Sequence, residues 1–204
     1  MGEMVDVKKR ERIRRKLGNT SVGIAGLGGL GSNAAVSLAR AGVGKLVLVD
    51  FDSVEKGNLD RQYYFLHQVG KPKVDAIAEN IKNIDPDVKV EAFNLKLEKG
   101  AMEKPFRDVD VIIEALDNAE TKAVFIEEIL SKLSGKPLVA ASGVAGYGNS
   151  ERIKTLRSGN LFLCYDEHAP SSEEDVLIAP RVALMGNWEA NLALEIILGR
   201  ETDD

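Results

Sequence analysis

The segment SVGIAGLGGLG, residues 21–31, decides the fold of this chain. It begins with an apolar run that is typical of a buried parallel strand, and residues 32–41 after it follow a helical pattern. A second apolar run, residues 46–49, ends on Asp50, about 20 residues beyond the last glycine. A strand, a glycine turn, a helix, a strand and an acidic residue in this order indicate a Rossmann-like dinucleotide-binding unit.

The turn contains four glycines that are expected to approach a nucleotide: Gly26, Gly28, Gly29 and Gly31. Without side chains they let the backbone turn tightly and come close to a phosphate. The helix that follows directs its free N–H groups and the positive end of its dipole toward that phosphate. Asp50 is expected to hydrogen-bond a ribose hydroxyl. The segment therefore predicts a nucleotide site.

A second group of polar side chains follows the acidic residue. It comprises Asp52, then Asn58, Arg61 and Gln62 of NLDRQ, then Lys73 of GKPK. Side chains of this kind bind phosphate and neutralise its charge, which an enzyme that handles a triphosphate requires. An NAD-dependent oxidoreductase, the alternative for a glycine turn of this type, leaves these residues unexplained.

Five motifs in order give the chain a resemblance to a known family. They are GLGGLGS, VDFD, NLDRQ, GKPK and ALDN, the last at residues 115–118. Together they resemble the E1-like adenylyltransferases of the ThiF/MoeB type, in which NLDRQ is usually NLNRQ. The resemblance covers residues 12–199, and within the family the chain is most similar to the short, zinc-free ThiF branch. It implies the adenylation of a carboxylate by ATP, with release of pyrophosphate.

The resemblance also implies roles for individual residues. Arg61 and Lys73 would contact the phosphates, Asn58 and Gln62 would position the nucleotide and the loop, and Asp117 would lie beside the nucleotide and Mg²⁺. Asn118 follows Asp117 in the same motif and is expected at the nucleotide as well. From its position alone, Asp117 is equally suited to cap the helix expected at residues 120–133.

The expected acceptor is the C-terminal Gly-Gly carboxylate of a small ubiquitin-like sulfur carrier protein. The short form without zinc favours a ThiS-like carrier and thiamine biosynthesis, with a MoaD-type carrier for molybdopterin as the alternative. Adenylation of a tRNA-nucleoside carboxylate and a nucleotide-binding scaffold without catalysis are further alternatives. Cys164, the single cysteine, cannot form a four-cysteine zinc site, and its apolar surroundings favour a structural role over catalysis.

Composition limits the remaining classes. With 204 residues, 44% of them hydrophobic, the chain is expected to form one domain with a full core. The net charge of −5 argues against general nucleic-acid binding. No apolar run approaches the roughly 20 residues that span a bilayer, and residues 1–17 are too charged for a signal peptide. The single cysteine is compatible with a reducing cytoplasm.

These signals predict an α/β fold, a doubly wound and mostly parallel sheet with an antiparallel C-terminal extension. Residues 1–20 are expected to form an N-terminal helical segment, and residues 143–180 an antiparallel extension with a loop that covers the substrate. In the doubly wound order, strand one lies between strands two and four, so Gly26, Asp50 and Asp117 would face one crevice.

An arginine cluster near the N-terminus gives an expectation about assembly. Members of the family supply an N-terminal arginine to the triphosphate in a partner subunit, and Arg12, Arg14 and Arg15 are all candidates here. Arg14 represents them in the expected set of nucleotide-binding residues. The resemblance therefore implies a homodimer with shared sites. A solvated helical cap is the alternative reading of the same charges.

Overall fold

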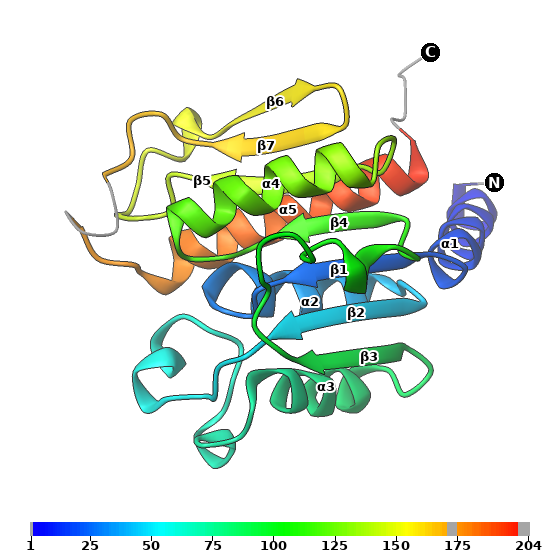
Figure 1. Cartoon of the computed structure of the whole chain (residues 1–204). Coiled ribbons are helices and arrows are strands. Elements are labelled where there is room, and N and C mark those ends of the chain that lie inside the picture. The colour runs from blue at the N-terminus through cyan, green and yellow to red at the C-terminus, as the bar shows by residue number, and fades with distance from the viewer. Residues whose placement is uncertain (1, 171–174, 200–204) are drawn as a thin grey trace.

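A single seven-stranded sheet organises the computed structural model, which describes residues 2–170 and 175–199 (Figure 1). The strands are β1 (Ser21–Ala25), β2 (Lys45–Asp50), β3 (Lys89–Asn94), β4 (Val111–Glu114), β5 (Leu138–Ser142), β6 (Lys154–Ser158) and β7 (Leu161–Tyr165). The α-helices are α1 (Gly2–Gly18), α2 (Gly29–Ala41), α3 (Lys73–Ile84), α4 (Ala119–Lys132) and α5 (Ala179–Leu198). Residue 1 of the expected helical segment and residues 171–174 of the expected cover loop lie outside the described residues.

The strand order confirms the doubly wound topology. It runs β3-β2-β1-β4-β5-β7-β6, with β1 between β2 and β4. The first six strands in this order pair in parallel, and only β6 is antiparallel to its neighbour β7. The antiparallel extension is therefore the outermost pair alone. The chain passes β5, forms β6 at the edge and returns as β7 in the position next to β5.

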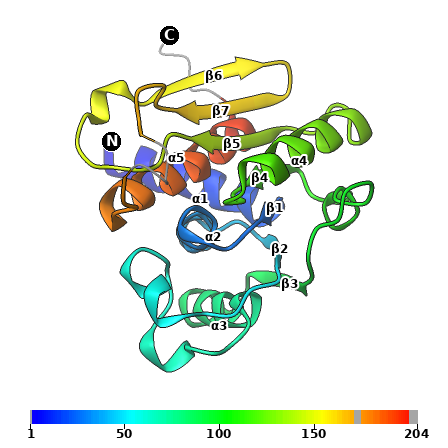
Figure 2. The ribbon, with the colours of Figure 1, turned by 60° about the vertical axis from the view of Figure 1, so that its left-hand side comes forward.

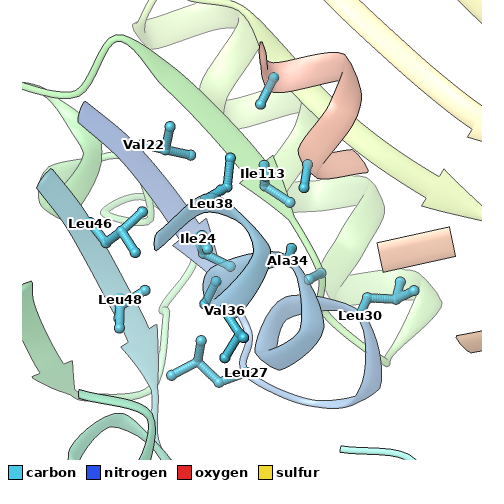
Figure 3. Close-up of a cluster of buried hydrophobic side chains, with 14 of the residues drawn as sticks. Val22, Ile24, Leu27, Leu30, Ala34, Val36, Leu38, Leu46, Leu48 and Ile113 are labelled. Carbon is cyan, nitrogen blue, oxygen red and sulfur yellow. The ribbon is translucent and has the colours of Figure 1, made fainter. Parts of the chain in front are cut away.

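Alternate residues of the strands supply two separate cores. Ile24, Leu48 and Ile113 belong to the larger core, beneath α2, α3 and α5 (Figure 3). Val47 and Ile112 point to the opposite face and pack with Phe125 of α4. Figure 2 shows α4 on the other side of the sheet from α2 and α5. This alternation is the period of two that burial on both faces requires.

Close packing between α2 and α5 positions the functional end of the molecule. A Cβ at Gly186 of α5 would lie 2.6 Å from the Leu30 carbonyl oxygen, so only glycine permits this approach. A Cβ at Gly29 would lie 2.5 Å from Cγ1 of Val182. The first turn of α5 therefore lies directly against the glycine turn.

The two ends of the sheet differ in what they carry. The loop between β2 and α3, residues 51–72, lies beyond the carboxyl ends of the strands, and α1 lies beyond their amino ends (Figure 1). Helix α3 begins at Lys73, directly after its N-cap residue Pro72. None of the described helices is long and apolar enough to cross a membrane.

Candidate active site

The glycines of the turn after β1 differ in how much space the protein leaves for a side chain. Gly26 has φ of 90°, and a Cβ there would lie 2.6 Å from the Ala115 carbonyl oxygen. A Cβ at Gly31 would lie 1.9 Å from the Gly26 carbonyl oxygen. At Gly28 the nearest atom to a Cβ would be Nε2 of Gln62, at 3.9 Å. The fold itself excludes a side chain at Gly26 and Gly31, whereas the protein leaves the face of Gly28 open.

Asp50 at the end of β2 is bonded to this turn. Its Oδ2 accepts a hydrogen bond from the Leu27 N–H at 2.6 Å, and its Oδ1 accepts one from the Asp52 N–H at 2.8 Å. Burial raises the pKa of the Asp50 carboxyl, although these two hydrogen bonds and the charge of Lys73 oppose the shift. The carboxyl group is therefore fixed in orientation beside the turn, where the sequence places the ribose.

Tyr64 is a residue of this site that the sequence did not indicate. Its hydroxyl donates to the Leu27 carbonyl oxygen at 2.8 Å, and its side chain is buried. The Leu27 peptide is thus held at its N–H by Asp50 and at its C=O by Tyr64. A tyrosine among the aromatic residues 63–65 gives no sequence signal for this contact.

The loop that carries Arg61 is bonded to the first turn of α2. The Tyr63 N–H donates to the Ser32 hydroxyl at 3.0 Å, and that hydroxyl donates to the Gly28 carbonyl oxygen at 2.6 Å. The Asn33 side chain donates to the Arg61 carbonyl oxygen at 3.2 Å. Arg61 is therefore placed beside the glycine turn by contacts from α2.

The two expected phosphate ligands each have an acidic neighbour. Nη1 of Arg61 lies 2.7 Å from Oδ1 of Asp60, and Nζ of Lys73 lies 2.8 Å from Oδ2 of Asp52. Lys73 is buried at the first turn of α3. Both cationic side chains are thus held by an aspartate at the carboxyl end of the sheet.

Asn58 and Gln62 have different environments. Oδ1 of Asn58 accepts from the Glu55 N–H at 3.0 Å and shapes the short 3-10 helix at Lys56–Asp60. Oε1 of Gln62 is buried and has no hydrogen-bond partner within the described part of the chain. Nε2 of the same side chain is the atom nearest to the open face of Gly28, and an amide N–H there suits a ligand that brings a hydrogen-bond acceptor, such as a phosphate oxygen.

The structure separates the two possible roles of Asp117. Asn118 is the N-cap of α4, and its Oδ1 accepts from the Thr121 N–H at 2.9 Å. Asp117 is exposed after β4 and has no ion pair or hydrogen bond from its side chain to the described residues. The cap therefore belongs to Asn118, and the carboxylate of Asp117 is accessible at the end of β4. Position alone could not distinguish the two neighbours.

The described residues contain no group of three or more His, Cys, Asp or Glu side chains that could hold a metal. A cation here would need oxygen atoms from a bound ligand besides a single carboxylate such as Asp117. Mg²⁺ commonly binds in this way, through one or two carboxylates and phosphate oxygens.

Arg14, an expected nucleotide-binding residue, lies away from the crevice, and Cys164, which was expected to be structural, is inaccessible. Arg14 is exposed, with its Cγ 3.9 Å from the position of a Cβ at Gly42. Gly42 caps the C-terminal end of α2, so Arg14 is at the end of the sheet opposite the glycine turn. Cys164 is fully buried, and burial raises the pKa of its thiol. A buried protonated thiol is unreactive, which agrees with the structural interpretation of Cys164.

Residues 4–204, almost the whole chain, match the ThiF family. The chain is 32% identical over 199 residues to the sulfur carrier protein ThiS adenylyltransferase of Escherichia coli, a match that covers 93% of this chain and 76% of that protein. It is 36% identical over 203 residues to the adenylyltransferase and sulfurtransferase uba4 of Aspergillus niger, covering 92% of this chain and 41% of that protein.

The chain is also 37% identical over 171 residues to the ubiquitin-like modifier-activating enzyme 5 of Bombyx mori, a match that covers 78% of this chain and 42% of that protein. The chain therefore spans about two fifths of the length of uba4 and of this enzyme. Among solved structures, the tRNA N6-threonylcarbamoyladenosine dehydratase TcdA of E. coli in complex with ATP has a TM-score of 0.83 at 22% identity, covering 92% of this chain and 89% of that one. This likeness shows the fold.

Proposed function

This chain belongs to the ThiF family, and from that membership we propose that it is an ATP-dependent adenylyltransferase that activates a carboxylate. The observation that carries the proposal is the open face of Gly28. Nε2 of Gln62 lies beside this face, and Arg61 is held beside the same turn. A triphosphate would bring acceptor oxygens and negative charge to this position.

The proposed nucleotide follows the carboxyl edge of the sheet. Its ribose lies at Asp50, after β2, and its phosphates lie at residues 26–31, after β1. The N–H groups of the first turn of α2 point at the phosphates, with the positive end of the helix dipole behind them. Asn58 holds the shape of the Arg61 loop, and Gln62 and Asn118 line the nucleotide from the two sides.

The reaction needs charge stabilisation more than acid–base chemistry. A carboxylate is already ionised at neutral pH, and its oxygen attacks the α-phosphorus while the bond from that phosphorus to the bridging oxygen breaks. Pyrophosphate leaves with the bonding electrons, and an acyl-adenylate remains. Arg61 and Lys73 stabilise the charge that develops on the leaving pyrophosphate, because both are held in place beforehand.

Mg²⁺ would neutralise phosphate charge and orient the phosphate oxygens. Asp117 is the residue that would hold it, directly or through water, because its carboxylate is accessible at the end of β4. The N-cap of α4 is Asn118, so the Asp117 carboxylate is not used there. No zinc is required for this chemistry. The absence of a cysteine cluster in the sequence favours an enzyme that works without a zinc module.

The proposed carboxylate is the C-terminus of a small ubiquitin-like sulfur carrier. The relatives named for ThiS adenylylation and for ubiquitin-like modifier activation support this class of acceptor. A ThiS-like carrier, and hence thiamine biosynthesis, is favoured because the ThiS adenylyltransferase is the named relative of which the chain covers three quarters. A MoaD-type carrier is the close alternative.

The test is ATP–pyrophosphate exchange with radiolabelled pyrophosphate. The purified protein is incubated with ATP, Mg²⁺ and either a ThiS-type or a MoaD-type carrier. We expect exchange that depends on the carrier and disappears when the terminal glycine of the carrier is removed. Binding of NAD without exchange would refute the proposal, and exchange driven only by tRNA would replace the acceptor.

A further inference from the structure

The loop between β2 and α3 holds two successive carbonyl groups of the glycine turn, one directly and one through Ser32. The Leu27 carbonyl oxygen accepts from the Tyr64 hydroxyl at 2.8 Å. The Gly28 carbonyl oxygen accepts from the Ser32 hydroxyl at 2.6 Å, and the Ser32 oxygen in turn accepts from the Tyr63 N–H at 3.0 Å. Two neighbouring residues of the loop therefore fix two neighbouring peptide groups of the turn.

A peptide group that is held at its carbonyl also has a fixed N–H. The two bonds point in opposite directions across a planar trans peptide, and none of the described peptide bonds is cis. The contact with Leu27 therefore directs the Gly28 N–H away from Tyr64, whose ring lies in the larger core. Gly28 precedes helix α2, and its N–H donates to no group in the part of the chain that the structure describes. This N–H is left for an acceptor that a ligand brings.

The Tyr64 hydroxyl is a donor that keeps its proton. The side chain is 5% exposed, and a buried phenol needs a hydrogen-bond partner. Burial raises the pKa of Tyr64, and the charges of Asp50 and Asp52 add to the shift. The hydroxyl therefore donates to the Leu27 carbonyl throughout the neutral pH range. A phenylalanine ring would fill the same space in the core without fixing this carbonyl.

Asp50 fixes the other side of Leu27. Its Oδ2 accepts from the Leu27 N–H at 2.6 Å. The peptide groups before and after Leu27 are thus each held by a buried side chain, one by the proposed ribose ligand and one by Tyr64. The proposed positions of the ribose and of the phosphates are therefore connected through one residue that is held on both sides.

We propose that Tyr64 is a positioning residue of the adenylation site, whose hydroxyl directs the Gly28 N–H at a phosphate oxygen of the bound nucleotide. The inference rests on the proposed function. It gives the hydroxyl a part in ATP binding that is separate from the packing of the ring. Tyr64 is buried behind the turn, so it acts through the peptide group between Leu27 and Gly28.

The test removes one oxygen atom from the protein. Tyr64→Phe keeps the ring and loses the hydroxyl. Tyr63→Phe is the matched control, because the contact of its hydroxyl with Nη2 of Arg40, at 3.4 Å, is exposed, and its backbone bond to Ser32 is retained. Calorimetry measures the affinity for ATP, and thermal denaturation measures stability. Single-turnover kinetics with a ThiS-type carrier give the adenylation rate at saturating ATP.

We expect Tyr64→Phe to lower the affinity for ATP about tenfold, the loss of one hydrogen bond to a charged group. The adenylation rate at saturating ATP should fall by less than the affinity, because Arg61 and Lys73 are unchanged. Tyr63→Phe should alter the affinity by less than about twofold. If Tyr64 served packing alone, its phenylalanine variant would lose thermal stability and keep its affinity for ATP.

The amide of Gly28 gives a readout that a merely structural role would not change. In protein prepared with ¹⁵N-labelled glycine, its NMR signal is identified by its absence from Gly28→Ala. A hydrogen bond to a phosphate oxygen moves an amide proton downfield. Saturating ATP should therefore shift the Gly28 amide proton downfield in wild-type protein and in Tyr63→Phe, and clearly less in Tyr64→Phe.

Unchanged ATP affinity in folded Tyr64→Phe protein, or an equal loss in Tyr63→Phe, would overturn the inference. A Gly28 amide proton that ATP does not shift in wild-type protein would also overturn it, even if Tyr64→Phe did not fold. Failure of wild-type protein to bind ATP would instead refute the proposed function, and the inference with it.

Discussion

Gly28 differs from its neighbouring glycines in what surrounds it, and this difference can be tested at the level of one residue. A Gly28→Val side chain would enter open space in the protein but would occupy the position of the proposed phosphate. We expect a folded protein whose ATP affinity falls at least a hundredfold, measured by equilibrium binding. Gly18→Val is the control, because nothing lies within 4 Å of a Cβ at Gly18 either.

Gly31→Ala provides the opposite case. Its Cβ would lie 1.9 Å from the Gly26 carbonyl oxygen, so the turn and the start of α2 must shift. This variant should lose thermal stability, whereas Gly28→Val should keep it. ATP affinity at the wild-type level in folded Gly28→Val protein would mean that the phosphates bind elsewhere.

Arg61 and Lys73 should matter more for the rate than for nucleotide affinity. Each is already oriented by a neighbouring aspartate, and the charge it stabilises increases as pyrophosphate leaves. Arg61→Ala and Lys73→Ala should each slow single-turnover adenylation by about 10²–10³, with a smaller change in the affinity for ATP. Rates near the wild-type value in both variants would exclude them from the transition state.

Glu189 in the middle of α5 is a buried acid that the proposed reaction does not use. Neither of its carboxyl oxygens has a hydrogen-bond partner in the described chain, and burial raises its pKa well above the usual 4.5. The folded state therefore binds its proton more tightly than the unfolded state. The resulting stability is complete below the usual pKa and is lost as the pH rises toward the folded pKa.

Glu189→Gln should remove this loss, since a neutral amide has no proton to release. From pH 4 to pH 8, the free energy of unfolding of the variant should rise relative to wild type, because only the wild type loses stability as its carboxyl group is ionised. Urea denaturation across this range measures the difference. A difference that does not change with pH would show that Glu189 is ionised in the folded protein.

At the scale of elements, α4 and the segment before β4 are joined by a charged network. Glu128 of α4 accepts hydrogen bonds from the Gly100 N–H at 2.7 Å and the Met102 N–H at 2.8 Å. Glu103 pairs with Arg107 at 2.6 Å and with Lys132 at 3.2 Å. The hydrogen bond from Arg107, assisted by Lys132, lowers the pKa of Glu103 from 4.5 to about 2.

This lowered pKa gives a stability that depends on pH in the acid range. The contribution of Glu103 is present above its unfolded pKa and is lost as the pH falls from about 5 toward 2. Glu103→Gln should therefore be less stable than wild type at pH 7, and most of this deficit should be gone at pH 2.5. Chemical denaturation at both values tests this. An equal deficit at pH 7 and pH 2.5 would exclude the ionised carboxylate as the cause.

The sequence predicted most elements because their signals are local. The glycine turn, the helical pattern in residues 32–41 and the apolar run before Asp50 each indicate one structure, and the parallel order then brings Gly26 and Asp50 to one edge. The return of β7 to a parallel position beside β5 was missed. It depends on pairing between Leu138 and Leu161, which no local pattern encodes.

The parts of the site that the sequence did not predict are tertiary contacts. The Tyr64 hydroxyl donates to the carbonyl oxygen of Leu27, 37 residues earlier in the chain. The guanidinium of Arg181 in α5 bonds to the Gly143 and Gly148 carbonyl oxygens and to the Asp166 carboxylate, which turns separate in the sequence. The choice between Asp117 and Asn118 as helix cap depends on backbone geometry at one residue. Such roles appear only when the strands are placed side by side.

At the scale of the whole molecule, α1 and the proposed nucleotide site are at opposite ends of the sheet (Figure 1). Leu17 packs into the larger core, and Nζ of Lys16 donates to the Leu198 carbonyl oxygen at 3.1 Å, so the end of α1 is fixed beside α5. Arg12, Arg14 and Arg15 are exposed on this helix. They cannot serve the crevice of their own chain without leaving this position.

A homodimer in which α1 of each chain reaches the crevice of the other would use these arginines, and mixing two defective variants tests it. One variant is the triple change Arg12→Ala, Arg14→Ala and Arg15→Ala, and the other is Lys73→Ala. In a heterodimer, the site with the altered Lys73 also lacks the arginines, while the other site has a normal Lys73 and normal arginines from its partner. In a two-fold dimer with random exchange, half the dimers are mixed and half their sites are intact, so about a quarter of the wild-type activity should return.

Pyrophosphate exchange measures the recovery after mixing, and mass spectrometry confirms that subunits have exchanged. If exchange is complete and activity stays at the level of the separate variants, the arginines act in their own chain or form a solvated cap. If the protein sediments as a monomer with full activity, shared sites are excluded.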